Sequence, residues 1–140
     1  MLPAIESSAY FDHDADIGVI GRGATLEEAF ESAAAGMFAI MTELPAVRRE
    51  RTVRTDFEEA DTELALVRWL NLLLASAREH GMVFAEFRLE RDGAVWRGRA
   101  TGEKWRRELA RGTEVKGATL TMLRVEQCGD EWQARCVVDV

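Results

Sequence analysis

The sequence is poor in the residues that hold small secreted proteins together. It has only 2 cysteines and 2 prolines in 140 residues. Cys128 and Cys136 flank a predicted tight turn without being clear opposite neighbours across it, and they lack the CxxC spacing of a zinc site. We therefore expect reduced cysteines in a cytoplasmic protein, with neither a disulfide nor a zinc framework.

Long apolar runs are also missing, and none reaches the length that a membrane-spanning helix needs. The N-terminal stretch "MLPAIESSAYF" lacks the basic region and apolar block of a secretory signal. No internal repeat or low-complexity linker interrupts the chain. We expect no membrane contact and a single domain over residues 1–140, which is long enough to bury a core.

Basic residues are in the minority, with 18 Lys and Arg against 25 Asp and Glu. The formal net charge of -7 argues against a protein that holds RNA or DNA mainly by neutralising phosphates. An acidic chain of this kind suits a cation site or a partner with a basic surface.

Hydrophobic spacing predicts two main helices. The first begins at "TLEEAF", where Thr25 is a good N-cap and Glu28 completes a capping box. The second runs through "DTELALVRWLNLLLASAREHG", with Asp61 or Thr62 as its cap and Gly81 at its end.

Most of the remaining segments predict strands. Residues 8–20 are expected to be extended, and "RTVRTDF" is a short strand candidate. Asp92-Gly93 and Gly129-Asp130 each separate two alternating runs, a pattern that favours β-hairpins. The element order predicts an α+β fold, with a mostly antiparallel sheet and two main helices packed on it.

Three aspartates, Asp12, Asp14 and Asp16, occupy alternate positions near the start of the chain. Alternate side chains of an extended segment share a face, so neighbours in this set would lie about 7 Å apart. Carboxylates at this separation repel one another, and a bound divalent cation would remove that repulsion. A solvated acidic face is the alternative, and spacing alone does not decide between the two.

Two other known uses of such a motif fit less well. An EF-hand loop needs glycine at its sixth position and glutamate at its twelfth, where this chain has Ile17 and Gly23. An aspartyl-phosphate enzyme would need more chain than remains after the motif. His13 alternates with the aspartates and by itself indicates a structural role.

One basic cluster stands out in this acidic chain. The stretch "GEKWRRELARG" gathers Lys104, Arg106, Arg107 and Arg111 around Trp105. Such a cluster suits a contact with phosphate, RNA or an acidic partner surface, and a solvated loop is an equal alternative.

Together these segments resemble a known family. "DHDADIGVIGRGATLEEAFESAAAGMFAIMT" resembles the opening of archeases, with a DHTAD-like motif, a glycine and a helix of the form TLEEAFxxAAxGMF. "VRWLNLLL" resembles the family's second helix, and "GEKW…GTEVKGATLTMLRVE" with "WQARCVVDV" resembles its closing strands. The resemblance covers nearly the whole chain and implies an SHS2-like fold, a strand–helix–strand–strand module elaborated with a further helix and strands.

The resemblance also implies a function. Archeases assist the RtcB-type RNA ligase, which joins RNA ends in tRNA splicing and RNA repair. They promote guanylylation of the ligase with GTP and support its multiple turnover. This chain is therefore expected to be a non-enzymatic accessory protein whose link to tRNA and other RNA is indirect, through the ligase.

A divalent-cation site, with calcium as the expected ion, follows from the same resemblance. Carried onto this chain, its ligands are Asp16, Asp139 and the terminal carboxylate of Val140, with Asp12, His13 and Asp14 as supporting groups. Carboxylate oxygens are the hard ligands that calcium prefers. The site requires the last strand to pair beside the first.

This chain departs from the family pattern in places. Asp14 stands where the family has threonine, and Leu120-Thr121 replaces a Tyr-His pair, which leaves the effect on partner binding open. Lys116 is retained, and Lys104, Arg106 and Lys116 are the expected partner contacts.

In the leading hypothesis the acidic end docks near the nucleotide site of the ligase, shares a cation and helps to align the GTP phosphates. Two alternatives remain at this point. One is a small metal-dependent phosphohydrolase that uses Asp12, Asp14 and Asp16. The other is a chaperone-like interaction module with no metal role.

Overall fold

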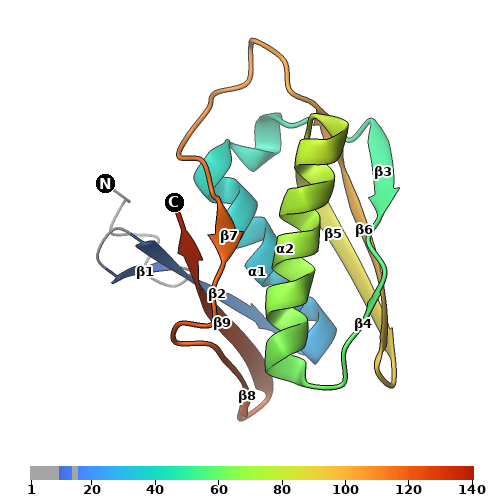
Figure 1. Cartoon of the computed structure of the whole chain (residues 1–140), viewed down its shortest axis with the longest axis vertical. Coiled ribbons are helices and arrows are strands. Elements are labelled where there is room, and N and C mark those ends of the chain that lie inside the picture. Colours follow the sequence, from blue (N-terminus) through green and yellow to red (C-terminus); the bar gives the residue numbers. More distant parts are fainter. Residues whose placement is uncertain (1–9, 14–15) are drawn as a thin grey trace.

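The computed structural model describes residues 10–13 and 16–140 (Figure 1). Its two long helices are α1, Leu26–Met41, and α2, Thr62–His80, and a 3-10 turn, Leu44–Ala46, follows α1. Sheet A contains β1, Tyr10–His13; β2, Asp16–Gly23; β7, Gly117–Ala118; β8, Arg124–Cys128; and β9, Glu131–Asp139. Sheet B contains β3, Arg51–Arg54; β4, Phe57–Glu58; β5, Met82–Asp92; and β6, Val95–Lys104.

Every strand pair that the structure describes is antiparallel. Sheet A follows the order β1-β2-β9-β7 with β8 also on β9, and sheet B centres on β6, which pairs with β3, β4 and β5. In Figure 1 sheet A lies to the left of α2 and sheet B to its right. The predicted α+β class is therefore confirmed, with the strands divided between two sheets.

The predicted start of α1 is confirmed in its hydrogen bonds. Thr25 Oγ1 accepts from the Glu28 N–H at 3.1 Å, and Glu28 Oε1 accepts from the Ala24 N–H at 3.0 Å. These bonds satisfy N–H groups that have no partner within the helix. The buried face of α1 then packs into the core, with these residues: Leu26, Ala29, Phe30, Ala33, Ala34, Met37, Phe38 and Ile40.

Helix α2 has Asp61, and not Thr62, as its N-cap. Asp61 Oδ1 accepts from the N–H groups of Glu63 and Leu64, each at 2.9 Å. At the other end Gly81 has a φ of 64°, a left-handed conformation that glycine adopts without a side-chain clash. No helix among the described residues is long and apolar enough to cross a membrane.

An aromatic stack joins the helices to sheet B. The Trp96 ring lies 5.1 Å from that of Phe30 and 5.7 Å from that of Phe57, nearly parallel to both. Trp69 on α2 donates its Nε1–H to the Phe30 carbonyl at 3.0 Å, and Trp96 donates to the Glu59 carbonyl at 2.9 Å. Both indoles are fully buried, and both N–H groups are paired as burial requires.

The expectation of one extended segment over residues 8–20 is wrong for the described part of that range. Strands β1 and β2 pair with each other, from Tyr10 opposite Val19 to His13 opposite Asp16. The chain therefore reverses direction between His13 and Asp16. Alternation of residue types cannot reveal such a reversal, because both strands of a hairpin keep the same period of two.

Helix α1 lies unusually close to β2 at Gly21. A Cβ atom placed on Gly21 would come within 2.1 Å of the Ala29 carbonyl oxygen and 2.4 Å of the Ala33 amide nitrogen. These are backbone atoms of the helix, so a rotamer change cannot relieve the overlap. The absence of a side chain at this position sets the separation between helix and sheet.

We predict that Gly21→Ala destabilises the protein by about 3 kcal/mol, because the helix must move away from sheet A. Urea denaturation measures this loss. Gly36→Ala within α1 is the matched control, since its Cβ would meet only Val19 Cγ1, at 3.2 Å, and alanine favours the helix. The control should stay within about 1 kcal/mol of the wild type, and an equally small loss for Gly21→Ala would contradict the close approach.

Candidate functional site

One end of sheet A brings together residues from both ends of the sequence. Strand β2 pairs with β9 so that Ile17 lies opposite Val138, and the same register continued by one residue places Asp16 opposite Asp139. On the other side of Asp16 lies His13 of β1, and on the other side of Asp139 lies Gly117 of β7. Figure 1 shows β9 ending beside β7.

The two aspartates share the face of the sheet that points away from the core. Val19, Cys136 and Val138 occupy the core face and are fully buried, so the alternation of side chains sends Asp16 and Asp139 the other way. Asp139 is exposed and Asp16 is half-buried. Residues directly opposite in an antiparallel pair have Cβ atoms about 5 Å apart, so the two carboxylates repel each other.

These carboxylates fit part of a site for a hard divalent cation. Neither has an ion pair or hydrogen bond from its side chain to another residue that the structure describes. Both offer oxygen ligands from adjacent strands, the donor type that calcium prefers. Among the described residues no group of three or more His, Cys, Asp or Glu could hold a metal ion, so further ligands would have to complete the shell.

The other predicted metal groups are placed less fully. The backbone of Asp12 and His13 belongs to β1, where Asp12 lies opposite Ile17. Asp14 lies outside the described residues. Asp12 and Asp16, two of the residues of the phosphohydrolase hypothesis, therefore lie on two paired strands and not at alternate positions of one strand. Val140 is half-buried and packs against the core, and the role of its carboxylate stays a prediction.

Lys116, a predicted partner contact, adjoins the acidic pair. Its N–H donates to the Asp139 carbonyl at 2.7 Å, and its side chain is exposed. Arg78, near the end of α2, donates to the carbonyls of Val115 and Lys116, each at 2.8 Å. These bonds tie the backbone beside Asp139 to α2.

Lys104 and Arg106, the other predicted contacts, lie at the far end of the 105–116 loop. Lys104 ends β6 and is exposed. Arg106 donates from Nε to Glu103 Oε1 at 2.8 Å and from Nη2 to the Ala46 carbonyl at 3.1 Å. The guanidinium of Arg106 therefore holds the loop in place, a structural role that the sequence did not indicate.

Glu103, the partner of Arg106, is a buried carboxylate with 3% of its surface exposed. Burial alone would raise the pKa of Glu103, but hydrogen bonds from the Arg48 amide and the Arg106 guanidinium, with the positive charges of both residues, hold this pKa below its ordinary value of 4.5. The charged form of Glu103 is thus favoured in the folded protein.

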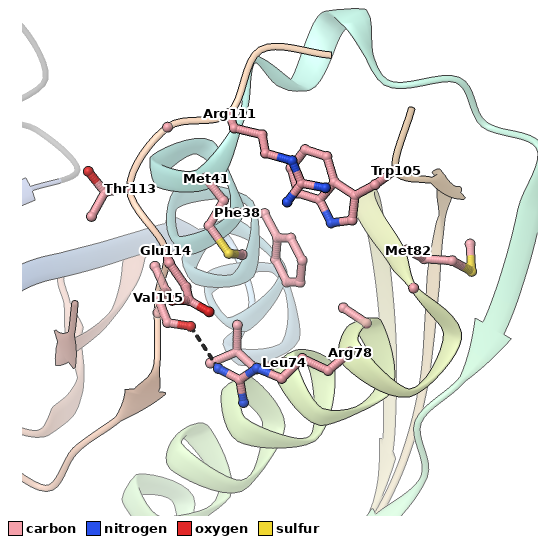
Figure 2. A pocket seen from close by; sticks show the side chains of 13 residues that line it. Phe38, Met41, Leu74, Arg78, Met82, Trp105, Arg111, Thr113, Glu114 and Val115 are labelled. Atoms are coloured by element: carbon pink, nitrogen blue, oxygen red, sulfur yellow. Dashed lines mark hydrogen bonds between the residues drawn. The ribbon is translucent and has the colours of Figure 1, made fainter. Parts of the chain in front are cut away.

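A cavity of about 530 Å³, which was not predicted, lies beneath the same loop. Its floor is apolar, with Phe38, Met41 and Leu74, and it lies near the ends of both helices. Figure 2 shows Arg111 across the ring of Trp105, at 4.0 Å from the ring centroid, and the hydrogen bond from Arg78 to Val115. The interleaving of Trp105 with arginines was the only signal in this region.

Comparison with known proteins decides the family. The model of the Archease protein family matches residues 9–140. Protein archease from Sulfolobus acidocaldarius is 38% identical over 136 residues, which cover 94% of this chain and 96% of the relative. The chain belongs to the archease family. Protein archease from Pyrococcus furiosus is 34% identical over 137 residues, with coverage of 94% and 96%.

Solved structures agree with this assignment to the archeases. The solution structure of Methanobacterium thermoautotrophicum protein 1598 matches with a TM-score of 0.83 and 30% identity, covering 94% of this chain and 96% of that one. The crystal structure of an archease from Thermotoga maritima, described as a possible chaperone, matches with a TM-score of 0.67. Its identity is 22%, with coverage of 93% and 94%, so this second match concerns the fold alone.

We predict that calcium stabilises the protein through Asp16 and Asp139. A dissociation constant near 0.1 mM would give about 2.7 kcal/mol at 10 mM calcium, which raises Tm by roughly 5 to 10 °C. Asp16→Asn and Asp139→Asn should each remove most of this rise. Without calcium both variants should be at least as stable as the wild type, because the repulsion is gone.

Differential scanning fluorimetry with and without calcium measures these shifts. Asp130→Asn is the matched control, since Asp130 lies in the turn before β9, at the opposite end of that strand, and should keep the full rise. A calcium response of equal size in all four proteins would show that the ion binds elsewhere.

The contribution of Glu103 to stability should depend on pH. The depressed pKa of Glu103 means that its carboxylate stabilises the fold above pH 4.5 and that this contribution is lost as the pH falls through the lower folded-state pKa. Glu103→Gln should therefore lower Tm by roughly 3 to 8 °C at pH 7, with a smaller difference at pH 3.5.

Thermal unfolding at the two pH values tests this sign. Glu108→Gln is the control, because Glu108 lies 3.8 Å from the same Arg106 but its side chain is 72% exposed. It should change Tm by under about 2 °C at either pH. A deficit for Glu103→Gln that grew toward low pH would contradict the direction of the pKa shift.

Proposed function

We propose that this archease is a non-enzymatic accessory protein that activates an RtcB-type RNA ligase, promoting its guanylylation and turnover in tRNA splicing and RNA repair. The observation that carries the proposal is the register of β2 and β9, which brings Asp16 and Asp139 together at one end of sheet A. Family membership supports the choice of partner.

The geometry suits presentation of this acidic end to another protein. Asp139 is exposed, and its strand is held on one side by β2 and on the other by β7. The Lys116–Asp139 backbone bond and the two bonds from Arg78 restrict the adjacent loop. The backbone that carries Asp139 is thus held in place before any partner binds, which reduces the cost of ordering it on binding.

A bound divalent cation, expected to be calcium, would supply positive charge for phosphate oxygens at this end of the sheet. The chain's own contribution is to hold carboxylate oxygens from two strands at one place, and to keep them at the surface. Lys116 adds a cation beside the pair, suited to contact an acidic group or a phosphate of the partner complex.

Two exposed apolar residues favour a second candidate, a metal-independent chaperone-like interaction module. Leu120 is 65% exposed and Met122 is 51% exposed, in the segment that follows β7. Exposed apolar side chains of this size are typical of protein contacts. This candidate requires the contact but not the carboxylates, so aspartate variants separate the two proposals.

The deciding experiment measures guanylylation of a purified RtcB-type ligase by GTP, with and without this protein, in calcium or magnesium. We expect stimulation by the wild type, and at least a tenfold loss of stimulation for Asp16→Asn and for Asp139→Asn, because each removes half of the carboxylate pair.

Asp130→Asn again serves as the control and should stimulate fully. Full stimulation by both site variants, with Leu120→Ser reducing it, would favour the metal-independent module. No stimulation by the wild type under any condition would overturn both candidates.

A further inference from the structure

The outer face of sheet B carries arginines in a pattern that the fold does not require. Alternation along β5 and β6 buries Leu89 and Ala100 against the core and turns Arg88 and Arg99 outward, where both are exposed. On β3, Val53 faces the core and Arg54 faces outward with a side chain that is 72% exposed.

The register sets these arginines in one row across three strands. Arg54 lies directly opposite Arg99, and Arg99 lies directly opposite Arg88. Directly opposite residues have Cβ atoms about 5 Å apart, so the Cβ atoms of the three arginines lie within a band of about 10 Å. Arg97 is two residues from Arg99 on β6 and therefore on the same face.

Carboxylates neutralise this row only in part. Arg54 pairs with Asp56 at 3.1 Å, and Glu86 is engaged by Arg49 at 3.7 Å. Arg88 donates from Nη1 to the Phe87 carbonyl at 3.0 Å, and its positive charge also interacts with the carboxylate of Glu31 on α1. Glu90 lies opposite Arg97 in the register but makes no ion pair within the described part of the chain. Like charges directly opposite each other destabilise a sheet, so this row costs folding free energy. Fold stability therefore does not explain why arginines occupy these positions.

The chemistry of the face fits phosphate groups better than a protein surface. Apart from half-buried Val95 at one edge, the outward residues of the row and its neighbours are polar: Thr52, Arg54, Glu58, Glu86, Arg88, Glu90, Arg97, Arg99 and Thr101. A protein interface is expected to have an apolar or aromatic centre, and this face has none. Guanidinium forks match phosphate oxygens, and no outward aromatic ring is available here to stack a base.

We infer that the outer face of sheet B is a weak, sequence-independent site for the phosphate backbone of single-stranded RNA, centred on Arg88, Arg97 and Arg99. The choice of RNA over other polyanions rests on the proposed function, in which the partner joins RNA ends. The net charge of -7 keeps the affinity low, and the Debye length of about 8 Å screens the row from distant acidic groups.

Fluorescence anisotropy with a labelled 10-nucleotide oligouridine, without ligase or divalent cation, tests this inference. We expect a dissociation constant of about 10⁻⁴ M at 50 mM salt for the wild type. The double variant Arg97→Gln with Arg99→Gln should bind about fivefold to tenfold more weakly. Its salt dependence should fall by about 1.4 in log–log slope, since each single-strand phosphate contact contributes about 0.7.

The matched control, Arg68→Gln with Arg124→Gln, removes the same charge from exposed sites outside this face and should bind within about twofold of the wild type. DNA of the same length should also bind within about twofold, because only phosphates are contacted. Equal weakening by the two double variants, equally tight binding of a polyglutamate peptide, or no binding by 1 mM wild type would each overturn the inference.

Two further readouts separate this inference from failed folding and from the proposed function. Arg99→Gln should raise Tm by about 1 to 3 °C, because it removes two like-charge contacts. Ligase guanylylation needs no RNA, so the Arg97→Gln, Arg99→Gln variant should stimulate it fully. Loss of that stimulation would place the arginines in the ligase contact and would contradict the RNA site.

Discussion

The pairing of β2 with β9 is the constraint on which the rest of this structure depends. The ladder runs from Ile17 opposite Val138 to Gly23 opposite Trp132, and so joins the start of the chain to its end. Its core face receives α1, which approaches β2 so closely that Gly21 cannot carry a side chain. Its end sets Asp16 beside Asp139. One register therefore determines both the helix packing and the candidate site, because a slip of one residue would turn every side chain to the other face.

Local features could be predicted from the sequence because the interactions behind them are local. Thr25 and Glu28 cap the start of α1 within one helical turn. Asp61 and Gly81 each act on the single turn at their own end of α2. The glycines of both hairpin turns have the left-handed φ that such turns need. The division into two sheets could not be predicted, because strand pairing joins distant segments. The same reason explains the error at residues 8–20, where one strand was expected and a hairpin is found.

The candidate site shows the same limit. Spacing alone drew attention to Asp12, Asp14 and Asp16 as neighbours along one strand, and only the resemblance to archeases directed attention to Asp139. The register then shows that His13, and not Asp12, is the cross-strand neighbour of Asp16. Likewise, the basic cluster was visible in the sequence, but the ion pair between Arg106 and buried Glu103 depends on a bend after β6 that no periodicity encodes.

Both proposed contact surfaces follow from one physical situation, in which the register of a sheet forces like charges together. On sheet A the charges are the carboxylates of Asp16 and Asp139, and on sheet B they are the guanidinium groups of Arg54, Arg99 and Arg88. Each like-charge contact costs a few tenths of a kcal/mol to about 1 kcal/mol, which a core built on the buried Trp96 stack can tolerate. A sheet cannot relieve the repulsion by sliding, because its other face is buried. In both proposals a ligand of opposite charge relieves it, so the free energy that each cluster costs in the isolated chain would become a preference for a cation at one sheet and for phosphate at the other.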